Sequence, residues 1–356
     1  MQNPVANSDS GINEIKILSA FEVDPSLLVE FYQTMYPGRI GFLKDNWSWL
    51  NRSSYLNNQI PLVLVLDDKI IAHAGMIPVE VKNREQRYSA GWFIDLAVLP
   101  EFQRSGYGSI LVRRRMEFTE LQITFPNDRS YLIFKKSGWE EPADSYMHYT
   151  LISPFNHRRF TKWLPSPLRG FLNSFLFLFM SGIYKKYADR DIDNHLTLLD
   201  DVSLNLLFSR YKQSLKESVD YIYPDRDDNF VQWRVLNSPN RDHYYIYNDQ
   251  EFSALLFLNK KTGCSVDVLW VSDTGKMQEI RKMLCDLAIT FRKDGYAYLR
   301  FYTTRNELSA YIRKYVRSVV KFRRFVYTSR NKSLIDEIRN STWNLELIDS
   351  DLEHTN

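Results

Sequence analysis

The segment from Phe93 to Ser109, which reads FIDLAVLPEFQRSGYGS, decides the fold. It predicts a strand that ends at Val98 and a loop that begins at Pro100. Gly106 and Gly108 then open a predicted helix. Glycines between a strand and a helix let a ligand approach the backbone closely, and the helix N-terminus adds unpaired N–H groups and a positive dipole. The segment therefore predicts a binding site for a pyrophosphate.

Two common phosphate-binding motifs do not describe this loop. The dinucleotide-binding fingerprint needs a third glycine at a fixed spacing, and the loop does not supply it. The P-loop needs Gly-Lys-Ser/Thr, which is also missing. The glycine pair therefore indicates a different class of phosphate site.

Outside this segment, the same order of elements is predicted twice. Each half begins with a Trp-to-Asn segment (47–51 and 233–237) and a hairpin with an Asp-Asp or Asn-Asp turn. The predicted strands are 61–66, 69–75, 92–98, 121–125 and 146–152 in the first half, and 243–247, 251–258, 265–271, 298–302 and 321–328 in the second. The predicted helices are 107–118 and 128–136, then 276–291 and 306–315. This order predicts an α/β (α+β) fold with a twisted mixed sheet flanked by helices in each half.

The domain boundaries follow from this repeat. We expect a first domain at 12–152, a linker with an apolar helix at 153–200, a second domain at 201–330 and a C-terminal tail at 331–356. The linker run from Gly170 to Tyr184 has no charge but is shorter than the roughly 20 residues of a membrane-spanning helix. Basic residues flank it: Arg158, Arg159, Lys162, Arg169, Lys185 and Lys186. We expect a buried helix; a helix that lies on a membrane or a partner is the alternative.

Helical periodicity predicts which side of that helix faces inward. Phe171, Phe175, Leu178 and Phe179 fall on one side, and we expect them to be buried.

Composition narrows the class of protein. The 356 residues include 46 Lys and Arg against 43 Asp and Glu, a net charge of +3, which is too near neutral for a dedicated nucleic-acid binder. Two cysteines and six scattered histidines form neither a disulfide framework nor a metal-ligand pattern, so we expect no metal. The polar N-terminus has no signal-peptide core, and we expect a cytoplasmic protein.

Residues 14–152 resemble the GCN5-related N-acetyltransferase (GNAT) superfamily. Its strand signature appears as Ile94-Asp-Leu-Ala-Val-Leu-Pro-Glu101, followed by Gln103-Arg-Ser-Gly-Tyr-Gly108. A second family element, an Asn and a small residue near a helix and then an aromatic-x-x-x-Gly-aromatic pattern, appears between Asn127 and Trp139. The resemblance implies an enzyme that uses acetyl-CoA, or another acyl-CoA, to acylate an amine.

The resemblance also implies which residues bind the cofactor. Backbone amides would hold the pyrophosphate, and the strand edge would pair with the pantetheine arm. The residues implied are Leu96, Ala97, Val98, Gln103, Arg104, Ser105, Gly106, Tyr107, Gly108, Ser109, Asn127 and Phe134.

Proton transfer is less well defined by the sequence. Asp95 is the candidate base, although a carboxylate here can instead hold a neighbouring strand. Many family members carry Tyr at the position of Phe134, where its hydroxyl can protonate the leaving thiolate. Here Tyr131, another group or solvent would take that role, or no acid would be needed.

The second half lacks the glycine pair. Its loop reads Ser272-Asp-Thr-Gly-Lys276, and Asp273 would repel a pyrophosphate, although Lys276 could partly compensate. We therefore interpret the second half as a degenerate copy that shapes the acceptor pocket or carries an interface.

The predicted activity is N-acetyl transfer to a small-molecule amine, such as an amino sugar or an amino-acid derivative. The acceptor would enter a cleft lined by aromatic side chains, for which the candidates are Trp47, Trp49, Tyr55, Trp92 and Trp233. For any single one of them, a place in the core is the favoured alternative. Two alternatives stay open: acylation of a cell-envelope saccharide or lipid-linked precursor, and a non-catalytic acetyl-CoA-binding protein. A homodimer is also left open.

Overall fold

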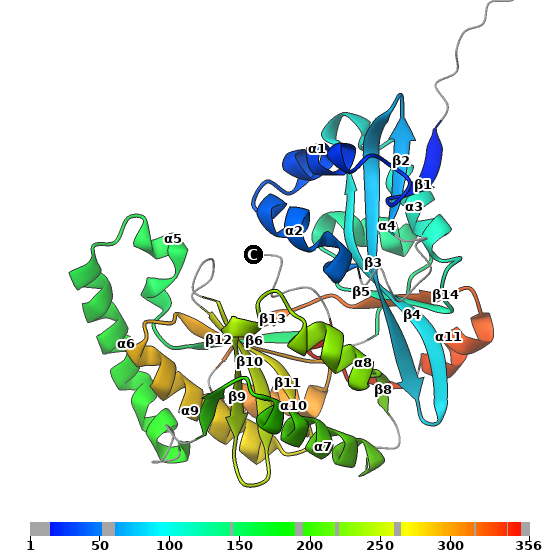
Figure 1. The fold of residues 1–356 in the computed structure, drawn as a ribbon. Coiled ribbons are helices and arrows are strands. Elements are labelled where there is room, and N and C mark those ends of the chain that lie inside the picture. The colour runs from blue at the N-terminus through cyan, green and yellow to red at the C-terminus, as the bar shows by residue number, and fades with distance from the viewer. Residues whose placement is uncertain are drawn as a thin grey trace, which may run out of the picture.

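The computed structural model describes residues 15–51, 61–142, 145–188, 195–217, 221–259, 265–316, 318–339 and 341–349. Within them the chain forms two mixed sheets, each flanked by helices (Figure 1). This is the fold class that the sequence predicts.

The first sheet is built mainly from the first half of the chain. Its strand order is β1 (Lys16–Ser19), β2 (Leu62–Leu66), β3 (Lys69–Asn83), β4 (Gln86–Val98), β5 (Leu121–Thr124) and β14 (Val326–Ser329). The far end of β3 also pairs with β8 (Tyr221–Pro224), which in turn pairs with β15 (Thr342–Trp343). Asp67 and Asp68 both have positive φ, which is the geometry of the predicted tight hairpin turn.

Helices cover both faces of the first sheet. Alternate residues of β2 pack on opposite sides, which separates two groups of helices. On one side are α1 (Pro25–Met35) and α2 (Ile40–Leu50), and on the other are α3 (Tyr107–Arg115) and α4 (Asp128–Lys136).

The second sheet has the order β13 (Val319–Phe322), β6 (Tyr146–Leu151), β12 (Tyr298–Thr303), β11 (Ser265–Val271), β10 (Ser253–Asn259), β9 (Tyr244–Asn248) and β7 (Leu196–Leu198). Helix α9 (Met277–Lys293) packs against α10 (Asn306–Val316) and α6 (Ser166–Tyr187). The other helices are α5 (Arg158–Thr161), α7 (Asp201–Glu217), α8 (Asp228–Val231) with a π-helical turn (Gln232–Leu236), and α11 (Lys332–Ile338).

The two sheets exchange their closing strands. Strand β6, predicted to close the first sheet, lies in the second, where it pairs with β12 and β13. The predicted strand 321–328 is split in two: β13 pairs with β6, and β14 crosses to pair with β5. The predicted self-contained sheets are therefore wrong, because apolar alternation indicates that a segment is a strand but does not identify its partner.

The stretch predicted as a tail is part of the fold. It contains α11, β15 and a 3₁₀ turn (Leu347–Asp349). The fully buried guanidinium of Arg226 donates twice to Asp349, over 2.9 and 2.6 Å, and lies 3.0 Å from Glu346. Glu346 also accepts from the backbone N–H of Val271 at the end of β11 (2.8 Å). Paired buried charges thus hold this segment against the second sheet.

A buried hydrogen-bond chain joins α1 and α2 to the first sheet. Trp47 Nε1 donates to the hydroxyl of Tyr32 over 2.7 Å, and this hydroxyl lies 2.9 Å from His73 Nε2. The carbonyl of Asp95 lies 3.0 Å from His73 Nδ1 and can only accept, so in the neutral ring Nδ1 carries the hydrogen and donates to it. His73 Nε2 then accepts from the Tyr32 hydroxyl. Burial lowers the pKa of His73 to about 4, so the ring is neutral at pH 7.

Helix α6 faces the opposite way from our expectation. Phe171, Phe175, Leu178 and Phe179, expected to be buried, are 55–72% exposed. The buried side is formed instead by Asn173, Phe177, Met180 and Tyr184. The helix is apolar nearly all round, so periodicity alone could not tell which side the rest of the protein covers. Among the described residues, no helix is long and apolar enough to cross a membrane.

The strand exchange predicts that the first half cannot fold alone. A fragment of residues 1–152 lacks β14 and β8, and its β6 has no partner strand. We expect no cooperative thermal unfolding of this fragment by circular dichroism. Co-expression with a fragment of residues 153–356 should restore a folded complex. A cooperative transition of fragment 1–152 by itself would contradict the exchange.

Buried, neutral His73 predicts a pH dependence of stability. The unfolded chain binds a proton to this histidine below its ordinary pKa of about 6.5, whereas the folded chain does so only near 4. Its contribution is therefore complete above pH 6.5 and is lost as the pH falls towards 4, by about 2 kcal/mol between pH 7 and pH 5. In urea unfolding, the free energy of unfolding of His73→Asn should fall by about 2 kcal/mol less between pH 7 and pH 5 than that of the wild-type protein. Between pH 7 and 8 neither protein should change, and an undiminished loss in the variant would refute the assignment.

Candidate active site

The central feature of the first sheet is the point where β4 and β5 part. They pair in parallel only from Ala90–Trp92 to Leu121–Ile123. At the parting, the hydroxyl of Thr124 donates to the carbonyl of Phe93 over 2.7 Å. Beyond it β4 continues along β3, with an irregular register between His73 and Gly75. The last residues of β4 therefore have one edge that β5 does not cover.

Backbone direction places a donor on this edge. The N–H of Leu99 donates to the carbonyl of Ile71 on β3 over 2.9 Å. Because successive residues of a strand point their backbone groups in opposite directions, those of Val98 point away from β3. The Val98 carbonyl indeed accepts from Gln103 Nε2 over 3.1 Å. The N–H of Val98 therefore points into the space between β4 and β5.

The start of α3 depends on one glycine for its shape and on another for its packing. Gly106 is the N-cap residue with φ +85°, and Arg104 also has positive φ (+70°). A Cβ on Gly106 would meet no atom within 4 Å, so the space beside it is open. A Cβ on Gly108 would lie 3.2 Å from Ile133 of α4. Gly106 thus keeps the approach to the helix end open, whereas Gly108 lets α3 pack closely against α4.

The first turn of α3 presents backbone donors. The first intrahelical bond runs from the N–H of Ile110 to the carbonyl of Gly106 (3.1 Å). The N–H groups of Tyr107, Gly108 and Ser109 precede it and have no partner within the helix. Ser105 is exposed beside them, while the Tyr107 ring packs near Phe102 (6.3 Å between centroids). This helix end is suited to an anion.

Asn127 caps the neighbouring helix α4. Its side-chain oxygen accepts from the N–H groups of Arg129 and Ser130, over 3.0 and 2.9 Å. The hydroxyl of Ser130 in turn accepts from the N–H of Asn127 (3.1 Å). This capping box makes Asn127 a structural residue whose exposed position lies at the start of a second helix.

Asp95 lies at the register irregularity of β4 and is held by two contacts. Its backbone has φ +50°, and its carbonyl accepts from His73. Its carboxylate pairs with Arg39, the residue before α2, over 2.6 Å, and both side chains are about one-tenth exposed. The carboxylate is therefore already engaged by a cation, and it connects α2 to the end of β4.

Phe134 is part of the core in this structure. It is 1% exposed and packs against Phe93 and Trp139, with centroids 5.5 and 4.5 Å away. The hydroxyl of Tyr131 donates to Glu141 over 2.6 Å, and this bond raises the pKa of Tyr131. Position 134 therefore offers neither a hydroxyl group nor an exposed ring face.

The aromatic residues expected to line a cleft have other contacts. Trp92 is 1% exposed in the core. Trp49 Nε1 donates to the carbonyl of Trp233 over 3.0 Å, and Trp233 Nε1 donates to that of Trp49 over 2.8 Å, so the pair joins the two halves. Trp47 is part of the hydrogen-bond chain through Tyr32. Tyr55 lies outside the described residues.

In the second sheet the parallel strands β11 and β12 also part, but the edge at the end of β11 is covered. Strand β11 pairs in parallel with β12 only up to Val268, and its register along β10 is irregular near Leu256. The carboxylate of Glu346 occupies the N–H of Val271 at the end of β11.

The loop after β11 is also occupied. Asp273 accepts from the N–H of Gly275 over 2.7 Å, and Lys276 pairs with Glu251 over 3.3 Å. The N–H of Gly275 and the ammonium group of Lys276, two groups that could meet a pyrophosphate here, therefore already have partners within the protein.

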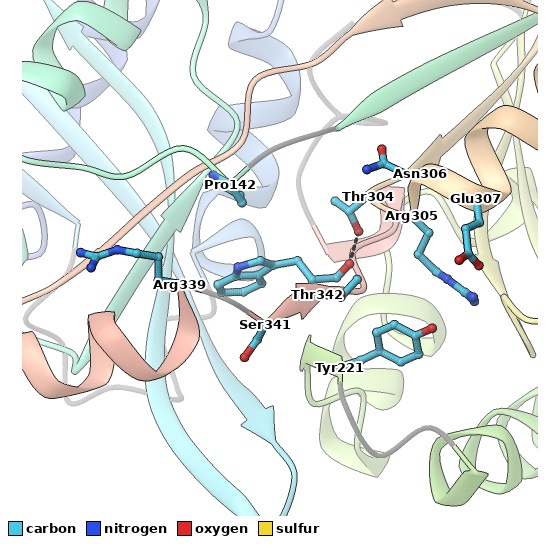
Figure 2. Close-up of a pocket in the computed structure, with 10 residues that line it drawn as sticks. Pro142, Tyr221, Thr304, Arg305, Asn306, Glu307, Arg339, Ser341 and Thr342 are labelled. Carbon is cyan, nitrogen blue, oxygen red and sulfur yellow. Dashed lines mark hydrogen bonds between the residues drawn. The ribbon is translucent and has the colours of Figure 1, made fainter.

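A cavity of about 350 Å³ is lined by Arg305, a residue that also contacts this loop (Figure 2). Arg305 projects beside it, donates to the hydroxyl of Thr274 over 2.9 Å and lies 5.0 Å from the Tyr221 ring centroid. The hydroxyl of Thr304 donates to the carbonyl of Trp343. The lining residues are Pro142, Tyr221, Thr304, Arg305, Asn306, Glu307, Arg339, Ser341, Thr342 and Trp343, and none is a residue that the sequence assigned to the site.

The part of the chain that the structure describes contains no assembled set of metal ligands. No group of three or more His, Cys, Asp or Glu side chains there could hold a metal ion.

Comparison with known proteins identifies the first half. Residues 27–138 match the model of the acetyltransferase (GNAT) family. No curated protein matches the chain.

Solved structures share the fold at low sequence identity. A GCN5-related N-acetyltransferase from Kribbella flavida is 10% identical, with a TM-score of 0.55 over 89% of this chain and 72% of that one. Another from Anabaena variabilis is 10% identical, with a TM-score of 0.53 over 90% and 74%. The Saccharomyces cerevisiae N-myristoyltransferase with bound myristoyl-CoA is 11% identical, with a TM-score of 0.56 over 91% and 83%. The chain thus has the fold of these GNAT proteins, and its residues 27–138 match the GNAT family model.

Proposed function

We propose that the first half binds an acyl-coenzyme A and transfers its acyl group to the amine of a small molecule. The acyl group we propose is acetyl, and the acceptor class is an amino sugar or an amino-acid derivative. The observation that carries the proposal is the open helix end at Gly106, which lies next to the inward-pointing N–H of Val98. Both belong to the family domain at residues 27–138.

The chemistry of these groups fits the two ends of the cofactor. The N–H groups between Arg104 and Ser109 would hold the pyrophosphate, where the helix dipole favours negative charge. The uncovered edge from Leu96 to Val98 would pair with the amides of the pantetheine arm. Acyl-coenzyme A supplies an activated thioester carbonyl. A fixed N–H such as that of Val98 would stabilise the negative charge that develops on its oxygen.

Asp95 could act as a general base or as a structural residue, and its contacts favour the structural role. The carboxylate already holds the Arg39 guanidinium over 2.6 Å, so it is engaged in a structural contact. The same ion pair fixes α2 against the bulge of β4. In this proposal the amine loses its proton to water or to a group of the acceptor pocket, and Asp95 is a positioning residue.

Substitution of Gly106 tests the cofactor site. Calorimetry with coenzyme A should give one molecule bound per chain in the wild-type protein. In Gly106→Glu, affinity should fall at least about tenfold, because a carboxylate would stand beside the pyrophosphate.

The matched control for this test is Gly106→Ala. It imposes the same left-handed backbone strain, about 1 kcal/mol, without the charge, and should keep most of the affinity. Equal affinity in all three proteins would remove the assignment, and a stoichiometry of two would contradict the closed second edge. Thiol release from acetyl-coenzyme A with a panel of amines would then separate an enzyme from a non-catalytic binder.

Substitution of Asp95 separates its two roles. Asp95→Asn tolerates the positive φ but removes the negative charge that faces Arg39 in a mostly buried ion pair, so we expect a loss of about 3 kcal/mol in the free energy of unfolding. Arg39→Gln should destabilise the protein similarly. As a positioning residue, Asp95→Asn should lower kcat less than about tenfold and leave the pH profile unchanged. Loss of a general base would instead cost about 100-fold or more and remove the acidic limb of that profile.

A further inference from the structure

The strongest unassigned surface of the molecule is the exposed side of α6. We define the α6 outer face as Leu168, Phe171, Phe175, Leu178 and Phe179, which are 44–72% exposed. These residues recur every three or four positions and so form one continuous stripe. The rings of Phe175 and Phe179 contact each other at 4.9 Å between centroids. Trp163, just before the helix, is 66% exposed.

Contacts on the opposite side fix this orientation. The hydroxyl of Tyr184 donates to the carbonyl of Leu151 on β6 over 3.0 Å. Asn173 accepts from the N–H of Phe155 and donates to Asn156. The guanidinium of Arg292 on α9 lies 3.8 Å from the ring centroid of Phe177. Turning the outer face inward would break all of these contacts, so its exposure follows from how the helix is anchored.

The helix also lies at the periphery of the fold. In Figure 1, α5 and α6 form an arm along the outer side of the second sheet, beyond α9 and away from the first sheet. A flat surface could therefore approach the outer face without meeting the first sheet.

The charged side chains of the segment that carries the outer face are all basic. Between residues 145 and 188 the sequence contains no Asp or Glu. It contains six basic residues, which form one group at each end of the stripe. The first group is Arg158, Arg159, Lys162 and Arg169, and the second is Lys185 and Lys186. All but Arg169 are exposed, and within the described residues no carboxylate pairs with any of the six. An apolar aromatic stripe between unpaired cations is the pattern of a helix that lies in a membrane interface.

We infer that the α6 outer face docks on an anionic lipid bilayer, with the aromatic stripe among the acyl chains and the two basic groups at the headgroups. A second copy of the chain is less suited to this face, because a symmetric dimer would bring the same cations together. The inference does not rest on the proposed catalytic activity. It would place α6 on the bilayer surface, with α9 and the second sheet behind it.

Vesicle co-sedimentation tests this docking. The full-length protein should pellet with vesicles of phosphatidylcholine and phosphatidylglycerol in a ratio of about 3:1, and at least about fivefold less with phosphatidylcholine alone. Salt at about 0.5 M should reduce the binding, since it screens the basic groups. Phe175→Ser combined with Phe179→Ser should lower the pelleted fraction at least about fivefold without lowering Tm, because both side chains are exposed.

Two controls make the result decisive. Phe322→Ser removes an exposed aromatic residue on β13, outside the outer face, and should leave vesicle binding unchanged. Lys185→Gln with Lys186→Gln should weaken binding to anionic vesicles only. Absence of wild-type binding, or equal binding by the Phe175/Phe179 variant, would overturn the inference. So would a dimer that this variant converts to a monomer in light scattering, because a second copy would then occupy the face.

Discussion

The exchange of β6 and β14 between the two sheets is the constraint on which the rest of the structure depends. Strand β14 covers the edge of β5, and β6 covers the edge of β12. The crossing segments pack through an aromatic cluster in which Phe125 contacts Tyr302 and Phe325, and Trp343 contacts Phe325. Because each sheet is completed by the other half of the chain, neither can shift or open as an independent body without breaking backbone hydrogen bonds.

Within this shared frame, small differences decide which cleft can accept a ligand. Both sheets have a parallel pair that parts next to an irregular strand register. In the first, the helix beyond the parting begins with an open glycine, and a backbone N–H points into the gap. In the second, Glu346 and Asp273 already occupy the corresponding donors. The asymmetry therefore comes from acidic side chains of the chain itself, of which Glu346 is paired with Arg226.

Much of the fold could be predicted from the sequence, and the failures share a cause. The bounds of β11 and α4 agree with the prediction, because turn residues and the Asn127 cap mark them locally. The strand exchange, the outward side of α6 and the Arg39–Asp95 pair could not be predicted, since each depends on a partner distant in sequence. The glycine pair marked the α3 N-terminus correctly, but only the structure shows that Gly108 serves packing. No local sequence pattern indicates the hydrogen-bond chain through Tyr32 and His73.

The strand exchange also determines the order in which the protein can be made. On the ribosome, β5 is synthesised long before β14, and the end of β11 emerges before the segment that carries Glu346. During that interval the nascent chain carries uncovered strand edges, which are sites of mispairing. The first sheet can therefore be completed only after β14 has been made, and a ribosome that stops before β14 releases a product whose first sheet lacks β14 and β15. Chaperones that hold such edges apart are the cellular factors on which production of this protein should depend.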